Sequence, residues 1–318
     1  MSDSSRKPGW LTIYAITAVV IILWGLSYIW SDRLLALDIP VEFIVPVRIF
    51  IAGLILLVLN LVQKKSIRIR DKDWAKFILL ALCEPFIYFV CETYGIKFTE
   101  SPTISALIIA LNPVFSVFVG LLFFKERVSL LNAIGIVVCL GGLFLVTRAH
   151  GEMGPMYVIG IILLFVAVIS EVSHITLTKT LSKGYAPSVI VMYQFLFGTV
   201  FFLPLFFTRG IASFDATLYF SWDVWYPMLM LSVLCSCVAF SLWAVSIKYL
   251  GVAKASVFLA MTPICTAVWG FILGDEFLRP LQWAGLGIAC VGLILTQQVA
   301  KKRIDRRKAG AQSSGSEA

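Results

Sequence analysis

Ten runs of 18–23 predominantly apolar residues follow one another along this 318-residue chain. The hydrocarbon core of a bilayer is about 30 Å thick, and about 20 helical residues cross it. Apolar residues make up 60% of the chain and charged residues only 14%, which leaves too little polar surface to cover a water-soluble globule. We therefore predict an all-α integral membrane protein with ten transmembrane helices, over residues 11–31, 42–62, 75–96, 103–124, 130–147, 156–178, 188–208, 226–247, 255–273 and 281–299.

Other architectures fit the sequence poorly. The runs lack the alternating pattern of a transmembrane strand, and the stretches between them are too short for a separate soluble domain. All seven cysteines fall inside the runs, without the spacing of a metal site or a disulfide framework. Nor do the sequence motifs include a phosphate-binding loop or a catalytic triad. We expect no metal, no cofactor and no enzymatic activity.

The basic residues predict the orientation in the membrane. Nineteen of the 26 Lys and Arg residues lie at the N-terminus, in every second loop after it or in the C-terminal tail, and five lie in the opposite loops. Because cytoplasmic segments are enriched in Lys and Arg, this distribution predicts both termini in the cytoplasm and a location in the inner (plasma) membrane. The net charge of +8 therefore indicates a lipid bilayer as partner, and not a nucleic acid.

A shift of 150 residues aligns segment 106–145 with 256–295. A weaker shift of 146 pairs Tyr28 with His174 and Arg48 with Gln194. Each copy holds five helices, an odd number, so the second copy must enter the membrane the opposite way. We predict two inverted five-helix repeats around a central cavity, residues 1–147 and 148–299, followed by a basic and then disordered cytoplasmic tail, 300–318. The strongest matches are Ala110 with Ala260, Pro113 with Pro263, Gly120 with Gly270, Glu126 with Glu276, Gly135 with Gly285, and Gly142 with Gly292.

Inverted repeats can open one site alternately to either side of a membrane, which favours transport. The remaining alternative is that duplication only enlarged the bundle.

Several segments resemble the EamA-type transporters of the drug/metabolite transporter superfamily. They are WGLSYIW in the first helix, PVRIFIAGLIL in the second, and the twice-used pattern of Pro, Gly, Glu and a Gly-rich helix in LNPVFSVFVGLLFFKERVSLLNAIGIVVCLGGLFLV and TPICTAVWGFILGDEFLRPLQWAGLGIACVGLIL. The resemblance spans nearly the whole chain. It implies an inner-membrane exporter of small metabolites or drugs, with a cavity lined by helices 1–4 and 6–9 and with helices 5 and 10 outside it.

Ionisable residues inside the runs are the first functional candidates, because burying them in lipid is costly. Glu84 lies near the predicted midplane, and Tyr88 and Glu92 follow on the same helix face at i+4 and i+8. Glu84 fits exchange of a proton or binding of a cation, with a structural hydrogen bond as the alternative. Glu92 and Arg48 lie at similar predicted depth, which favours a structural ion pair over a gate or a substrate contact at Arg48.

Glu171 and His174 share a face of the sixth helix, and Glu171 replaces Gly25 of the first repeat. A proton relay, an ammonium contact and a bond between helices all fit Glu171, and His174 fits a local hydrogen bond near the inner end of its helix.

Prolines and aromatic residues supply further candidates. Pro113 and Pro263 predict kinks in equivalent helices, either hinges or plain packing kinks, with Asn112 available to bond groups that the kink exposes. Glu126 and Glu276, at the ends of equivalent helices, are predicted structural anchors. Aromatic cavity walls are a further option for five residues that also fit ordinary packing: Trp24, Tyr28, Tyr88, Trp243 and Trp269.

These features predict a secondary active transporter that moves a small organic solute by alternating access. One Arg against three Glu favours a cationic or zwitterionic solute, such as an amino acid or an amine, over a phosphate. Export is the expected direction, and coupling to protons through Glu84 or Glu171 is an open option. A facilitative uniporter and a non-transporting membrane receptor or scaffold are the alternatives, and the oligomeric state is left open.

Overall fold

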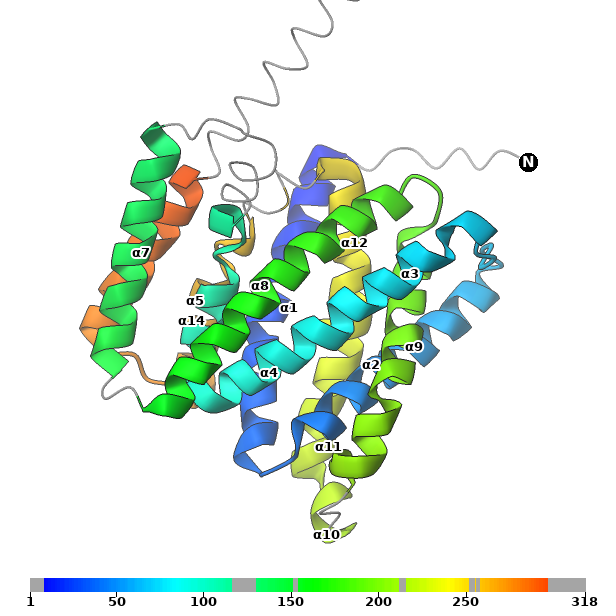
Figure 1. The fold of residues 1–318 in the computed structure, drawn as a ribbon, viewed down its shortest axis with the longest axis horizontal. Coiled ribbons are helices and arrows are strands. Elements are labelled where there is room, and N and C mark those ends of the chain that lie inside the picture. Colours follow the sequence, from blue (N-terminus) through cyan, green and yellow to red (C-terminus); the bar gives the residue numbers. More distant parts are fainter. Residues whose placement is uncertain are drawn as a thin grey trace, which may run out of the picture.

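The computed structural model describes residues 9–115, 130–150, 154–211, 216–251, 255 and 258–296. All regular structure in these residues is helical (Figure 1). Seven helical stretches are long and apolar enough to cross a membrane, and three shorter apolar helices accompany them, Pro102–Phe115, Thr262–Leu273 and Pro280–Thr296. The prediction of an all-helical, multi-pass membrane protein is confirmed.

The elements follow the predicted runs, with some runs divided. The first half holds α1 (Trp10–Ala36), α2 (Val41–Val62), η1 (Asp71–Asp73), α3 (Trp74–Ala81), η2 (Leu82–Ile87), α4 (Tyr88–Thr99), α5 (Pro102–Ile109) and α7 (Leu130–His150). The second half holds α8 (Pro155–Leu181), α9 (Pro187–Leu205), η3 (Phe206–Gly210), α10 (Ala216–Tyr219), α11 (Trp222–Leu229), η4 (Met230–Val238), α12 (Ala239–Leu250), α14 (Thr262–Leu273) and the Pro280–Thr296 helix.

The main helix contacts join the two halves of the chain. In Figure 1, α4 packs along α8 and α2 along α9, while α1 lies against α12 and α14. Each of these pairs takes one helix from the first half and one from the second. Side chains that point to the centre of the bundle therefore come from both halves.

The helices α7 and Pro280–Thr296 stand together at one side of the bundle (Figure 1). Their backbones touch, because a Cβ added to Gly142 would lie 2.3 Å from the backbone nitrogen of Ala289, and one added to Gly292 would lie 2.3 Å from that of Cys139. Small residues allow this close approach in membranes. The peripheral helix pair that the family resemblance implied is thus held by its glycines.

The two repeat-related prolines sit beside breaks in their helices. The helix α5 ends at Ile109, a turn covers Ala110 and Leu111, and helical structure resumes before Pro113. In the second half a turn precedes α14, whose first helical turn contains Pro263. Proline lacks a backbone donor and fits a first turn, where no partner is needed. The continuous, kinked helices predicted here are wrong, and the structure has discontinuous helices instead.

The predicted third helix is interrupted at Glu84. Residues Leu82–Ile87 form the π-type segment η2, in which Glu84 has an extended backbone with φ −144° and ψ 120°. Pro85 explains this conformation, because a proline disfavours helical geometry in the residue before it. The sequence prediction of one unbroken helix over 75–96 overlooked this proline.

Candidate functional site

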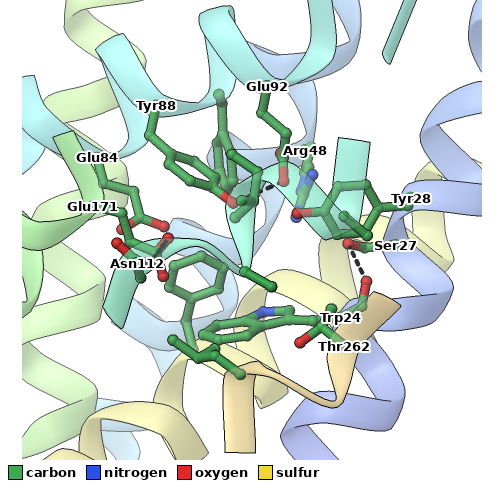
Figure 2. Close-up of a pocket in the computed structure, with 16 residues that line it drawn as sticks. Trp24, Ser27, Tyr28, Arg48, Glu84, Tyr88, Glu92, Asn112, Glu171 and Thr262 are labelled. Atoms are coloured by element: carbon green, nitrogen blue, oxygen red, sulfur yellow. Dashed lines mark hydrogen bonds between the residues drawn. The ribbon is translucent and has the colours of Figure 1, made fainter. Parts of the chain in front are cut away.

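A narrow cavity lies at the centre of the bundle, between the two halves (Figure 2). Its volume is about 30 Å³, and one water molecule needs about 10–15 Å³ of such space. The cavity therefore has room for water but not for an organic solute. Its walls come from Trp24, Ser27, Tyr28, Arg48, Glu84, Tyr88, Phe89, Glu92, Ala106, Ile109, Ala110, Asn112, Glu171, Phe240, Leu259 and Thr262.

Four charged side chains line this cavity, and none is more than 6% exposed. Glu84 comes from η2, Glu92 from α4, Glu171 from α8 and Arg48 from α2. Figure 2 shows Glu84 and Glu171 together on one side, and Arg48 with Glu92 on the other. The cavity thus has an acidic end, formed by Glu84 and Glu171, and an end that carries the cation Arg48.

Arg48 does not form the predicted ion pair with Glu92. Its Nε donates to the hydroxyl of Ser236 at 2.7 Å, and its guanidinium lies 4.3 Å from the centre of the Phe89 ring. Among the described residues no carboxylate is within ion-pair distance of Arg48. Glu92 instead accepts a hydrogen bond of 2.8 Å from Tyr88. The guanidinium turns instead toward η4 of the second half.

At the acidic end, residues that lie far apart in the sequence are in contact. Glu171 accepts a hydrogen bond from Asn112, which directly follows the break in α5. Glu84 Oε2 lies 2.5 Å from His174 Nδ1. The prediction of a local hydrogen bond for His174 is incomplete. The imidazole is 2% exposed and also contacts Glu84 of the first half of the chain.

Three of the five aromatic candidates line the cavity: Trp24, Tyr28 and Tyr88. Trp243 packs edge-to-face behind Trp24, at 5.2 Å between ring centres. Trp269 donates its Nε1 to the carbonyl of Ile22 at 3.2 Å, in the contact between α14 and α1. The prediction that Trp243 and Trp269 form walls of the cavity is wrong. The Nε1 of Trp24 is buried without a partner in the structure.

Contacts between the halves close the bundle on the face where α1 ends and α5 begins. The Glu276 carboxylate accepts hydrogen bonds from the hydroxyls of Ser101 and Thr103 and from the backbone N–H of Thr103. Beside it, Arg33 Nε pairs with Asp275 at 2.7 Å. Glu276 therefore caps a helix of the opposite half, in keeping with its predicted role as an anchor. Its repeat counterpart, Glu126, lies outside the described residues.

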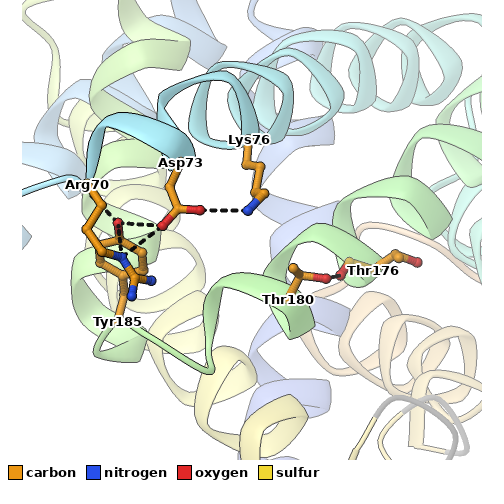
Figure 3. Close-up of polar contacts among 6 residues, drawn as sticks. All are labelled: Arg70, Asp73, Lys76, Thr176, Thr180 and Tyr185. Carbon is orange, nitrogen blue, oxygen red and sulfur yellow. Dashed lines mark hydrogen bonds and ion pairs between the residues drawn. The ribbon is translucent and has the colours of Figure 1, made fainter.

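The opposite face is closed by other bonds. Thr17 on α1 donates to Ser246 on α12 at 2.8 Å, and Lys179 on α8 donates to the carbonyl of Ile247 at 3.1 Å. On this face Asp73 also binds Lys76, Arg70 and the hydroxyl of Tyr185, which ties the start of α3 to the connection between α8 and α9 (Figure 3). Among the described residues, bonds between the two halves of the chain therefore lie on both sides of the cavity.

Sequence reasoning missed several neutral residues of the site. Ser236 holds Arg48, Gln194 faces His174, and Phe89 and Phe240 complete the walls. Small hydroxyls and phenyl rings carry little energetic cost in lipid, so they give no signal comparable to a buried charge. Of these residues, Gln194 was the one with a signal in the sequence, its weak repeat match with Arg48.

A multi-pass helical bundle with buried charged residues around a cavity between its halves is typical of a membrane transporter. The model of the EamA-like transporter family matches residues 10–148 and 158–297 of the chain. The chain belongs to this family, and the paired matches indicate duplicated halves.

Curated relatives agree with this assignment. The chain is 25% identical to the uncharacterized transporter YetK of Bacillus subtilis, over 92% of this chain and 88% of the relative. It is 24% identical to an uncharacterized transporter of Archaeoglobus fulgidus, over 91% and 99%. It is 29% identical to a probable terminal-alkyne amino-acid exporter of Streptantibioticus cattleyicolor, over 74% and 78%.

A solved crystal structure has the same fold. It superimposes with a TM-score of 0.67 over 94% of this chain and 99% of the other, at 17% sequence identity.

Proposed function

We propose that the protein is a secondary active transporter that exports a small zwitterionic or cationic solute, such as an amino acid or an amine, across the inner membrane. The observation that carries this proposal is the division of the cavity into an acidic end and an end with a cation. Arg48 has no carboxylate partner among the described residues, so its guanidinium is available to a carboxylate of the solute. Glu171 at the acidic end is available to an ammonium group.

The remaining walls suit the body of such a solute. Trp24 and Tyr28 present aromatic rings to the cavity, and rings attract ammonium groups and apolar side chains. The buried Nε1 of Trp24 and the buried Oδ1 of Asn112, both without a partner in the structure, add a donor and an acceptor. A phosphate would instead need several cations, and Arg48 is the one cationic residue among the side chains that line the cavity.

Bonds between the halves on both sides of this cavity support alternating access. The bonds of Glu276 hold one face and the Thr17–Ser246 bond holds the other. All of them join the first half of the chain to the second, so a rocking of inverted halves breaks one set at a time. The narrow cavity corresponds to an occluded state, and it must widen before an organic solute enters.

Export is favoured by the relative from Streptantibioticus, which is named an amino-acid exporter. The distribution of basic residues supports an orientation with both termini in the cytoplasm, and in that orientation the Glu276 face lies outside the cell.

Transport by purified protein in proteoliposomes tests this proposal. The probes are radiolabelled L-leucine, L-propargylglycine and putrescine, with succinate as the anionic comparison. We expect counterflow of at least one of the first three probes and none of succinate. Glu171→Gln should reduce this counterflow strongly, because the ammonium group loses its counter-charge, whereas Glu100→Gln, at an exposed residue, should leave it unchanged.

Succinate transport with no flux of the other probes would contradict the solute class. Absence of counterflow for every probe would contradict the function itself. Counterflow that never becomes concentrative under an ion gradient would identify a facilitative uniporter.

A further inference from the structure

Glu84 and His174 form a buried pair at the acidic end of the cavity. Glu84 Oε2 and His174 Nδ1 are 2.5 Å apart, and the two side chains are 5% and 3% exposed. The two atoms lie within ion-pair distance, and neither has another hydrogen-bond partner in the structure. Two bare acceptor atoms this close repel each other, so a proton bound between them stabilises the pair.

The other nitrogen of His174 also faces acceptors. Its Nε2 lies 3.2 Å from Gln194 Oε1 and 3.1 Å from the Thr178 hydroxyl. With the amide of Gln194 in this orientation, Nε2 donates to the amide oxygen. The ring of His174 is thus held at Nε2 by α9 and by its own helix, while Nδ1 faces Glu84 of the first half.

The titratable groups around the pair come from several elements. Glu171 of α8, Tyr88 and Glu92 of α4 and Cys83 of η2 face Glu84. From α9 the neighbour is the neutral amide of Gln194, and Lys76 of α3 is engaged by Asp73 at the membrane face. Three carboxylates thus share the cavity with the single cation Arg48. A proton on the pair brings this cluster closer to neutrality.

The pair is separated from the residues that we assign to the solute. Glu84 lines the cavity, but His174 lies behind it and is not part of the wall. Glu171 has its own partner in Asn112, and Arg48 lies at the other end. A proton can therefore bind at His174 without occupying the space of the solute.

We propose that Glu84 and His174 together form the proton-binding site that couples solute export to the proton gradient. This inference rests on the transport function proposed above. Glu84 belongs to the first half of the chain and His174 to the second, so any movement between the halves changes their distance. The shared proton is held while the halves lie as they do here. It is released to water when the pair separates, and the pair then cycles between net charges of zero and minus one.

A comparison of two transport modes tests this site. Counterflow needs solute binding and access but no net proton movement, whereas accumulation driven by a pH difference needs both. For one proton per solute, a difference of about one pH unit of the favourable sign supports up to about tenfold accumulation. We expect this accumulation in the wild-type protein with whichever of L-leucine, L-propargylglycine or putrescine shows counterflow.

His174→Gln should abolish the accumulation driven by the pH difference and the accompanying proton flux, measured with a pH dye inside the vesicles. It should retain counterflow, because the introduced amide can still form hydrogen bonds with its neighbours but does not titrate. Glu171→Gln should lose both modes. Thr176→Val and Thr180→Val are matched controls on the exposed face of the same helix (Figure 3), and both should behave as wild type.

Accumulation and proton flux that survive in His174→Gln would overturn the inference and leave the proposed transport function intact. The same holds if the wild-type protein shows counterflow but no proton flux. Failure of wild-type counterflow with all probes would overturn both. Glu84→Gln supplies a second test of the pair, and it must also lose proton flux, whatever the yield of folded His174→Gln.

Discussion

At the scale of single residues, the environment of Arg48 determines what the cavity can bind. Its Nε is held by Ser236 and its flat face by Phe89, which leaves the two terminal nitrogens without a bonded carboxylate among the described residues. A guanidinium held in this way presents two parallel donors to a carboxylate. In the proposed function, Arg48 therefore selects for solutes that carry a carboxylate.

Replacing Arg48 should change solute preference more than overall flux. Hydrogen bonds to charged groups contribute about 1.5–3 kcal/mol, so Arg48→Gln should raise the KM for a transported zwitterion about tenfold or more. Putrescine has no carboxylate and should be affected less. Arg48→Lys keeps the positive charge but lacks the two parallel donors of a guanidinium. Its KM for the zwitterion should lie between those of the wild type and Arg48→Gln. Initial rates over a range of solute concentrations measure these changes.

The control for this prediction is Ser236→Ala, which removes the contact at Nε and leaves the guanidinium in place. Equal losses for the zwitterion and for putrescine in Arg48→Gln would show that Arg48 serves the fold and not the solute.

The sequence predicted which charged residues are candidates but not which neighbours they face. Counting residues from the end of a run predicted Glu84 near the midplane and Arg48 closer to the outer end of its helix, and both line the cavity. The count does not say which neighbouring helix a side chain faces. For that reason the predicted Arg48–Glu92 pair is absent, and the contact of His174 with Glu84 went unpredicted.

At the scale of elements, the glycines of α7 decide how the peripheral helices pack. Gly142 sits against the backbone of the Pro280–Thr296 helix, whereas nothing lies within 4 Å of a Cβ added to its neighbour Gly141. The two positions differ by one residue on the same helix. They form a matched pair for measuring what close backbone contact contributes.

Gly142→Ala should destabilise the protein although alanine favours helix. The added methyl would meet the Ala289 nitrogen at 2.3 Å, so the helices must move apart, at a cost of about 1–3 kcal/mol for overpacking. Gly141→Ala should be neutral or stabilise by up to about 1 kcal/mol. Thermal unfolding in detergent, followed by loss of monodisperse protein, compares the two variants. Equal unfolding midpoints would contradict the close contact.

The capping of α5 by Glu276 is a second element-scale contact with a testable role. Three donors of one half meet this carboxylate of the other, at the N-terminus of a helix, where negative charge is favoured. Loss of an N-terminal cap costs about 0.5–2 kcal/mol. Glu276→Ala should therefore shift the protein toward states open on this face.

Cysteine labelling measures this shift. In a background without the seven native cysteines, a cysteine at Ser27 in the cavity wall should react faster with a membrane-impermeant maleimide in Glu276→Ala than in the parent protein. Glu100→Gln, at an exposed residue of the same face, should not change the rate. An unchanged rate in both variants would limit Glu276 to a role in folding.

At the scale of the whole molecule, the repeat explains where the helices deviate from regular geometry. The breaks at Ala110–Leu111 and Ala260–Met261 lie 150 residues apart, as the repeat predicts. The π segment η2, shifted by the 151 residues that relate Ile96 to Ile247, falls within η4. Irregular backbone at membrane depth is tolerated where it lines a cavity. Pro113 and Pro263 predicted irregular backbone near the two breaks. The segment η4 contains no proline, so no residue in it predicted its π-type backbone.

Duplication also explains the charge asymmetry of the cavity. Arg48 and Gln194 correspond in the repeats, as do Tyr28 and His174. In the second half this pair of positions holds His174 against Gln194, next to Glu84. In the first half it holds Tyr28 and Arg48, both in the cavity wall. Equivalent positions have thus diverged into the end that we assign to the proton and the end that we assign to the solute carboxylate.

Both assignments require the halves to be inverted, and membrane topology tests this directly. The sequence predicts five crossings between the N-terminus and residue 148, so a reporter fused after Arg148 should lie outside the cell and one fused after residue 299 inside. Alkaline phosphatase, which is active outside, and a fluorescent protein, which is active inside, should give opposite signals at these two sites. A fusion after Gln63, at the end of α2, should match the fusion after residue 299. If the fusions after 148 and 299 report the same side, the halves are parallel, and neither alternating access around a shared cavity nor release of the Glu84–His174 proton by rocking would follow.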